Sequence, residues 1–334
     1  MENSTLNRGI YPFAFVIFMD SLGLTLSVSL NVFHVLVLAR TVSLFSMNLR
    51  LCLKVLALSD ILGGLLCYGM EIIVYFKREI VTSNVHGCNM AAAFCTIFVG
   101  FSQFILFVIT IDRYIAVTRP LQYFNTLPRR RIRILLLTAF VGGVFTGIGR
   151  SVHGTMIDYC DFNTSHKLFT QLIMVIYHIV PIALVMITTF LNARLLSIAR
   201  AHAKRNKTTH QSRDTSHDPE QHSFSERFKS AITISAVVGA SYMVWLPYLT
   251  ITIMCLAMNS DLSFVGKAVM YWLLYATFWL NPIVIGVVSE KYRNAVHKAI
   301  KGRVLSPSNS SSNSELCRFR HSSREQVVEA HDKN

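Results

Sequence analysis

Asp112 and Arg113 are the first candidates for chemistry, because an acid and a base stand side by side at the end of an apolar run. Positions 89–111 hold no charged residue, and Tyr114 follows the pair. Adjacent opposite charges favour a local ion pair, which contributes little stability on an exposed surface. From these residues alone, the pair is either a switch or a charged helix end that marks a membrane boundary.

Three other polar residues interrupt apolar runs. Asn31 lies in SLNVFHVLVLAR, Asp60 in LALSDILGG and Asn281 in FWLNPIVIG. Polar groups at membrane depth are rare and costly, and they usually face a protein or water-filled interior. Each can be a locally satisfied structural residue. Their presence in three different runs predicts one shared polar cluster.

Signatures of catalysis or of a metal centre are lacking. The sequence has no Gly-rich phosphate loop, no His-x-x-x-His pair with a Glu and no serine nucleophile motif. The histidines between 202 and 222 follow no regular metal-binding spacing, so a disordered loop over about 195–226 is the better interpretation. We therefore expect neither an enzyme nor a metal site.

Long apolar segments must position these residues. The chain is 52% hydrophobic and 15% charged, with a mean hydropathy of +0.44, whereas a soluble domain is about 25% charged. A membrane-spanning helix needs roughly 20 mostly apolar residues. Pro181 and Pro247 add kink signals within two of the runs. The expected fold is an all-α membrane protein, a bundle of seven transmembrane helices with spans at about 13–38, 52–76, 89–111, 133–149, 170–193, 230–257 and 266–287.

The loops predict an extracellular N-terminus. With that orientation, 26 of the 32 Lys and Arg fall on the cytoplasmic side, as the positive-inside rule requires. These basic residues flank the spans rather than form one face, so the net charge of +14 does not indicate a nucleic-acid partner. Glycosylation sequons at Asn3 and Asn163 then lie outside. Cys88 and Cys160 also lie outside, where they form a disulfide or stay unpaired thiols.

The order and spacing of these motifs resemble the rhodopsin-like (class A) G-protein-coupled receptors over about residues 12–302. SEKYRNAVHKAIKG, at 289–302, reads as a short amphipathic eighth helix on the inner membrane face. The other residues that carry the resemblance are Asn31, Asp60, Cys88, Asp112, Arg113, Tyr114, Pro181, Trp245, Leu246, Pro247, Asn281 and Pro282.

The resemblance implies a plasma-membrane receptor that transmits an extracellular signal to a heterotrimeric G protein. In such receptors Asp112 pairs with Arg113 at rest, and Arg113 contacts the G protein when the sixth span moves outward. Leu121 matches an apolar contact to the same partner, and the Ser-rich tail suits receptor kinases and arrestin. Cys317 is a candidate for palmitoylation. Two alternatives stay open: a receptor-like scaffold that couples to nothing, and a multi-span transporter.

Several positions depart from the family pattern. Ile285 and Thr189 replace two tyrosines that usually meet in the active state, so basal activity is an open question. Gln103 replaces an aliphatic residue and Ser241 an aromatic one. The residues expected in a sodium-type pocket are only partly kept: Asn31, Asp60, Ser102 and Asn281 match, while Thr277 and Phe278 depart.

The ligand is predicted only as a class. Cys95 stands where amine receptors carry an aspartate, and Tyr275 stands where opsins carry the retinal lysine. A small molecule or short peptide is expected, with membrane lipid as the surroundings. The domain prediction is an extracellular N-terminus (1–12), the bundle (13–288), the amphipathic helix (289–302) and a disordered cytoplasmic tail (303–334). Candidate ligand contacts are Glu71, Cys95, Thr96, Tyr177, His178, Tyr248, Lys267, Tyr271 and Tyr275.

Overall fold

The computed structural model describes residues 2–41, 44–76, 85–153, 168–210, 219–258 and 264–300. Within these ranges six helices are long and apolar enough to cross a membrane, and one bent helix pair makes a seventh span. The predicted seven-span helical bundle is confirmed. The helices are α1 (Glu2–Arg40), α2 (Met47–Phe76), α4 (Val85–Thr118), α5 (Tyr123–Thr126), α6 (Arg129–His153), α7 (Leu168–His210), α8 (Pro219–Met258), α9 (Phe264–Tyr275), α10 (Thr277–Val288) and α11 (Glu290–Ile300).

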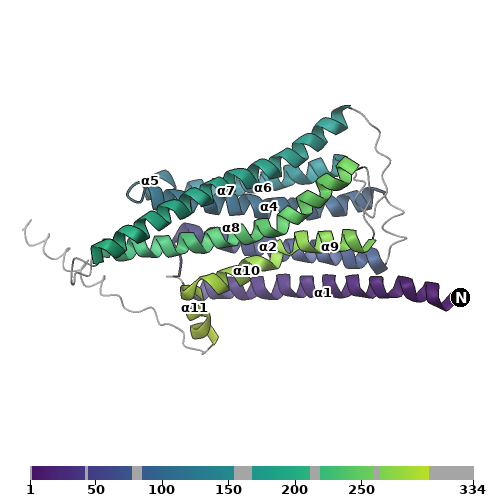
Figure 1. Cartoon of the computed structure of the whole chain (residues 1–334), viewed down its shortest axis with the longest axis horizontal. Helices are drawn as coiled ribbons and strands as arrows, with labels where there is room; N and C mark the ends of the chain where they lie inside the picture. The colour runs from purple at the N-terminus through teal and green to yellow at the C-terminus, as the bar shows by residue number, and fades with distance from the viewer. Residues whose placement is uncertain are drawn as a thin grey trace, which may run out of the picture.

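The long helices run side by side, and α4 lies at the centre of the bundle. It packs against α2, α5, α6, α7 and α8. The N-terminus and α11 lie at opposite ends of the molecule (Figure 1). The end that carries α11 is called the inner end, after its predicted cytoplasmic side, and the other is the outer end.

Glycines let α6 approach α4 closely. A Cβ atom on Gly143 would lie 2.7 Å from the carbonyl oxygen of Ile97, and one on Gly147 would lie 2.9 Å from that of Ala93. Such small residues allow helix backbones to meet in a membrane. The glycines that weaken the apolar pattern of the fourth span are therefore packing residues, which help to fix the helix that carries Asp112 and Arg113.

The seventh span is bent, although the sequence predicted one continuous helix over 266–287. α9 and α10 meet at Ala276 with an angle of 46° between them. The backbone N–H of Ala276 is shared between the carbonyl oxygens of Trp272 (3.0 Å) and Leu273 (3.1 Å). This shared donor accommodates the change of direction, which directs α10 toward the inner end.

One loop prediction was wrong over much of its length. The disordered loop expected at about 195–226 is helical at 195–210, within α7, and at 219–226, within α8. Ala, Leu, Arg and Lys dominate the first of these stretches and favour helix even without an apolar face. Residues 211–218 lie outside the described part of the chain.

α11 is amphipathic, as its sequence predicted. Tyr292 and Ala295 are buried, whereas Lys291, Arg293 and Lys298 are exposed. Tyr292 contacts α1 through a hydrogen bond between its hydroxyl and His34 Nδ1, at 2.8 Å. This bond anchors α11 beside the inner end of the bundle. Residues 301–334, including the Ser-rich tail and Cys317, lie outside the described residues.

Candidate functional site

The inner site is centred on Asp112 and Arg113, near the end of α4. Arg113 Nε donates to Asp112 Oδ2 at 2.9 Å, and Arg113 Nη2 donates to the same oxygen. Asp112 is fully buried and Arg113 is only 3% exposed. A buried ion pair must have its remaining hydrogen-bonding groups satisfied by neighbours. Its stability here therefore depends on side chains from other elements.

The second carboxylate oxygen of Asp112 is held by α5. The hydroxyl of Tyr123 donates to Asp112 Oδ1 at 2.6 Å. Asn48 Nδ2 donates to the Tyr123 oxygen at 3.1 Å and to the carbonyl of Leu127 at 3.0 Å. Burial, reinforced by the nearby Asp112 charge, raises the pKa of Tyr123 from 10.0 to about 12. Tyr123 therefore stays protonated, and remains a donor, at neutral pH.

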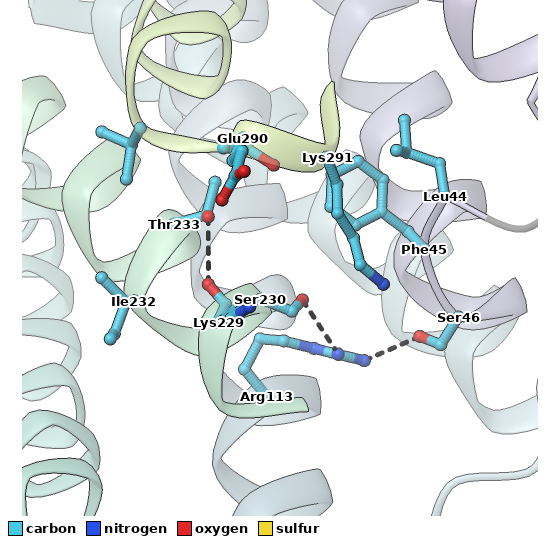
Figure 2. A pocket seen from close by; sticks show the side chains of 12 residues that line it. Leu44, Phe45, Ser46, Arg113, Lys229, Ser230, Ile232, Thr233, Glu290 and Lys291 are labelled. Atoms are coloured by element: carbon cyan, nitrogen blue, oxygen red, sulfur yellow. Dashed lines mark hydrogen bonds between the residues drawn. The ribbon is translucent and has the colours of Figure 1, made fainter. Parts of the chain in front are cut away.

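The remaining nitrogens of Arg113 reach two hydroxyls on different elements. Nη2 donates to Ser46 Oγ at 2.8 Å, just before α2, and Nη1 donates to Ser230 Oγ at 3.3 Å, on α8. Figure 2 shows Arg113 between the two serines. The guanidinium thus links α4 to α8, and its partner on α8 in this bond is a serine hydroxyl, not a carboxylate.

These residues border an inner cavity of about 390 Å³. Its wall also carries Lys229, from α8, and both Glu290 and Lys291, at the start of α11 (Figure 2). Nearby Leu121 is 93% exposed, beyond the end of α4, while Tyr114 is half-buried. The geometry suits a partner that inserts an apolar and hydrogen-bonding segment into this end of the bundle.

The predicted polar cluster lies in the bundle core. Ser102 Oγ donates to Asp60 Oδ1 at 2.6 Å, and Asn281 Nδ2 donates to Asp60 Oδ2 at 2.8 Å. Ser241, the residue that replaces an aromatic, donates to Asn281 Oδ1 at 3.3 Å. Asp60 is fully buried. Spans two, three, six and seven are therefore joined by one hydrogen-bonded network.

Asn31 joins this network indirectly and satisfies a backbone defect. Because Pro282 has no N–H, the carbonyl of Phe278, one turn earlier, loses its helical donor. Asn31 Nδ2 donates to that carbonyl at 2.6 Å and to the carbonyl of Ser27 at 2.8 Å. Ser27 Oγ in turn donates to the backbone carbonyl of Asp60 at 2.9 Å.

The donor set around Asp60 fits a small monovalent cation. It offers a carboxylate and the hydroxyl of Ser102, which are hard oxygen ligands. Asn31 is linked to the backbone of Asp60 through Ser27, and its Oδ1 atom is buried without a hydrogen-bond partner among the described residues. Within the same ranges, no cluster of His, Cys, Asp and Glu suits a multivalent metal.

Trp245 lies one turn beyond Ser241 on α8 and is 6% exposed. Its ring meets that of Tyr248 edge-to-face, with centroids 6.1 Å apart. Pro247 lies within the continuous helix α8 and is exposed. A small cavity is lined by Trp245, Pro181 and Gln103. The Trp245 ring therefore packs between the outer aromatic cluster and the polar core.

Four of the predicted ligand contacts are brought together in an aromatic cluster of the outer half: Cys95, Tyr248, Tyr271 and Tyr275. Glu71, on α2, is half-buried three residues beyond Tyr68 of the same cluster. Thr96 instead donates to the carbonyl of Ala92 in its own helix, at 2.9 Å. The side chains of Tyr177, His178, Lys267, Cys88, Cys160, Asn3 and Asn163 lie outside the described part of the chain, so the proposed disulfide and glycosylation sites stay predictions.

Several residues of interest were not singled out from the sequence, among them Asp20, His34, Asn48 and Tyr123. Asp20 and His34 carried a signal, because both interrupt the first apolar run, as Asn31 does. Asn48 and Tyr123 carried none, since polar and aromatic residues are ordinary near membrane boundaries. Only the folded chain brings them to Asp112.

Known proteins resemble this chain in sequence. The guinea pig (Cavia porcellus) histamine H2 receptor is 28% identical over 263 residues, which are 75% of this chain and 70% of that protein. A trace amine-associated receptor 365 of Petromyzon marinus is 24% identical over 76% of this chain and 70% of its own length. Melanopsin-A of Danio rerio is 26% identical over 64% of this chain and 38% of its own length. The model of the 7 transmembrane receptor (rhodopsin family) matches residues 30–284. The chain therefore belongs to the rhodopsin family of seven-transmembrane signalling receptors, which are not enzymes.

Proposed function

We propose that the chain is a plasma-membrane receptor that activates a heterotrimeric G protein through Arg113. The observation that supports this most is the arrangement of Arg113 at the inner cavity. Its guanidinium is shared between Asp112, Ser46 and Ser230. Arg113 is thus held by its own helix, by the segment before α2 and by α8, beside a space of about 390 Å³ that an inserted segment can enter.

The mechanism follows from which of these bonds is easiest to break. Ser230 belongs to α8, the sixth span, so outward movement of its inner end removes the 3.3 Å bond to Arg113. The guanidinium then gains a free donor for a partner's backbone carbonyl, while Asp112 remains held by Tyr123. A ligand that binds the outer end more tightly in the open state shifts this equilibrium. Exposed Leu121 supplies an apolar contact to the same partner.

Other parts of the proposal rest on the sequence. The N-terminus is placed outside because most Lys and Arg lie at the opposite side. The tail at 303–334 serves receptor kinases and arrestin. We also propose that Asp60 and Ser102 hold a sodium ion, whose charge would offset that of the buried carboxylate. Palmitoylation of Cys317 stays a prediction.

The ligand is proposed to be a small molecule bound at the outer aromatic cluster. Two of the relatives bear the names of histamine and trace amine receptors. Cys95, however, replaces the aspartate expected for an ammonium partner in such receptors. An amine ligand therefore requires an acid elsewhere in the outer half.

A receptor-like scaffold that does not couple is the second candidate. Ile285 is 1% exposed and packs in the core, whereas Thr189 faces outward from α7. Neither provides the hydroxyl contact that the two usual tyrosines would form. This departure favours a weaker active state, because one stabilising link is missing.

The test compares ligand-free G-protein activation by wild type and Arg113→Ala in transfected cells at equal surface expression. We expect a basal signal that falls to background in Arg113→Ala and is reduced in Leu121→Ala. Leu137→Ala, at an exposed position on α6, is the matched control. Equal signals above background from wild type and Arg113→Ala would contradict the proposed role of Arg113.

A further inference from the structure

Asp20 is a buried acid that the proposed switch does not use. It lies in the outer half of α1 and is 4% exposed. Its Oδ2 atom has no hydrogen-bond partner among the described residues. An unpaired buried carboxylate is costly, so it must either take up a proton or pair with a cation. The fold thus keeps a position in the outer half at which positive charge is favoured.

Aromatic side chains surround this position. Trp272 Nε1 donates to the carbonyl of Met19, next to Asp20, at 2.8 Å. One turn along α1, a Cβ atom on Gly23 would lie 2.8 Å from the Tyr68 hydroxyl oxygen. Because Asp20 and Gly23 are three residues apart, they share the face of α1 that packs against Tyr68, and Trp272 is bonded to the same stretch of α1.

These rings belong to one larger cluster that reaches a second acid. Tyr68 meets Tyr275 edge-to-face, with centroids 5.6 Å apart, and Tyr275 stacks on Tyr271 at 6.0 Å. Glu71 lies three residues beyond Tyr68 on α2, and therefore on the same face of that helix, one turn nearer the outer end. Asp20 on α1 and Glu71 on α2 are thus both within about one helical turn of residues that pack at Tyr68, with Asp20 the more deeply buried of the two.

We propose that Asp20, together with Glu71, forms the anionic part of a binding site for an organic cation, and specifically for a protonated amine. This inference rests on the proposed receptor function and names its ligand class. Aromatic faces attract weakly hydrated organic cations, and a carboxylate oxygen without a partner can accept a charge-assisted hydrogen bond from an ammonium N–H. Span three carries Cys95 and no acid at the position where amine receptors carry an aspartate. In this proposal Asp20 of span one and Glu71 of span two supply the negative charge.

The test measures binding to the purified full chain in lipid nanodiscs, without a G protein. The probes are radiolabelled 2-phenylethylamine and histamine, with 2-phenylethanol as the neutral competitor of the same shape as the first. We expect at least one amine to bind wild type, and the alcohol to compete at least about tenfold more weakly. Asp20→Asn removes the charge and keeps the shape, so it should weaken amine binding about 10- to 100-fold. Glu71→Gln should weaken it less.

Ser21→Ala, on the exposed face of α1 beside Asp20, is the matched control and should bind like wild type. Ligand-free thermal unfolding of Asp20→Asn checks that the variant is folded. If Asp20→Asn does not fold, the comparison of the amine with the alcohol on wild type still tests whether the site requires a positive charge. The proposal is overturned if neither amine binds, if the alcohol binds as tightly, or if folded Asp20→Asn binds like wild type. If amine binding depends on Asp20 but the chain activates no G protein, this binding site is supported and only the proposed G-protein coupling is contradicted.

Discussion

Ser230 provides the most informative perturbation of the proposed switch. Its hydroxyl accepts the bond from Arg113 Nη1 that directly links the guanidinium to α8. Ser230→Ala removes this link and changes neither charge nor helix propensity greatly. Because the bond exists only while α8 is close to α4, its loss should shift the population toward the open state. We therefore predict that Ser230→Ala raises ligand-free signalling.

The size of the effect follows from the geometry. The bond is long, at 3.3 Å, and Ser230 is half-buried, so its contribution should lie near the lower end for hydrogen bonds, about 0.5–1 kcal/mol. That free energy corresponds to an increase of about 2- to 5-fold in a small open population. The closed state should remain the major one, because Ser235 Oγ still donates to Asn192 Oδ1 on α7 at 3.0 Å and holds α8.

The assay is basal G-protein activation per receptor at the cell surface. Ser197→Ala is the matched control. Among the described contacts, the exposed Ser197 hydroxyl donates a hydrogen bond only to the carbonyl of Ala193 in its own helix. A double variant with Arg113→Ala should show no increase, since the mutation acts through Arg113. Basal signalling of Ser230→Ala at or below the wild-type level would refute the idea that this bond restrains α8.

Two further predictions concern stability. Asn31→Leu should lower the free energy of unfolding by about 1–3 kcal/mol, because the Phe278 carbonyl loses its donor. Tm in nanodiscs should fall by about 2–4 °C for each kcal/mol. A Tm equal to that of the control variant Val32→Leu would argue against this role of Asn31. Tyr123→Phe should cost about 1.5–3 kcal/mol by removing a bond to a charged group. The folded-state pKa of Tyr123 is raised, so its contribution is fully present below pH 10.0 and is lost as pH rises to about 12. Wild type should lose more stability over that range than Tyr123→Phe, and identical pH profiles would show that the proposed hydrogen bond is wrong.

Much of the bundle was predictable because hydropathy reports directly on membrane spans. Asp60 and Asn281 each interrupt an apolar run and must find a polar partner inside, and the two side chains are hydrogen-bonded to each other. Ser102, which also bonds Asp60, was indicated only by the family resemblance. The break at Ala276 was not predictable, because it depends on how one N–H is shared within a continuously apolar segment.

The partners of the switch were harder to predict. Ser46 and Ser230 are ordinary boundary residues in the sequence, and only the approach of α8 to α4 makes them ligands of Arg113. Tyr123 belongs to a short helix whose position relative to Asp112 depends on the tertiary fold. Asp20 was visible as a charge in an apolar run, but its unsatisfied oxygen appears only when its neighbours are placed.

Nucleotide exchange on a G protein, the activity proposed for this chain, should be measured with purified components. Exchange on each family of heterotrimers is measured with the full chain in nanodiscs, with Arg113→Ala, and with empty nanodiscs. We predict faster exchange on at least one heterotrimer with wild type, and the empty-nanodisc rate with Arg113→Ala. Exchange at the empty-nanodisc rate on every heterotrimer, even after Thr189→Tyr and Ile285→Tyr restore the missing tyrosines, would contradict it and favour the non-coupling scaffold.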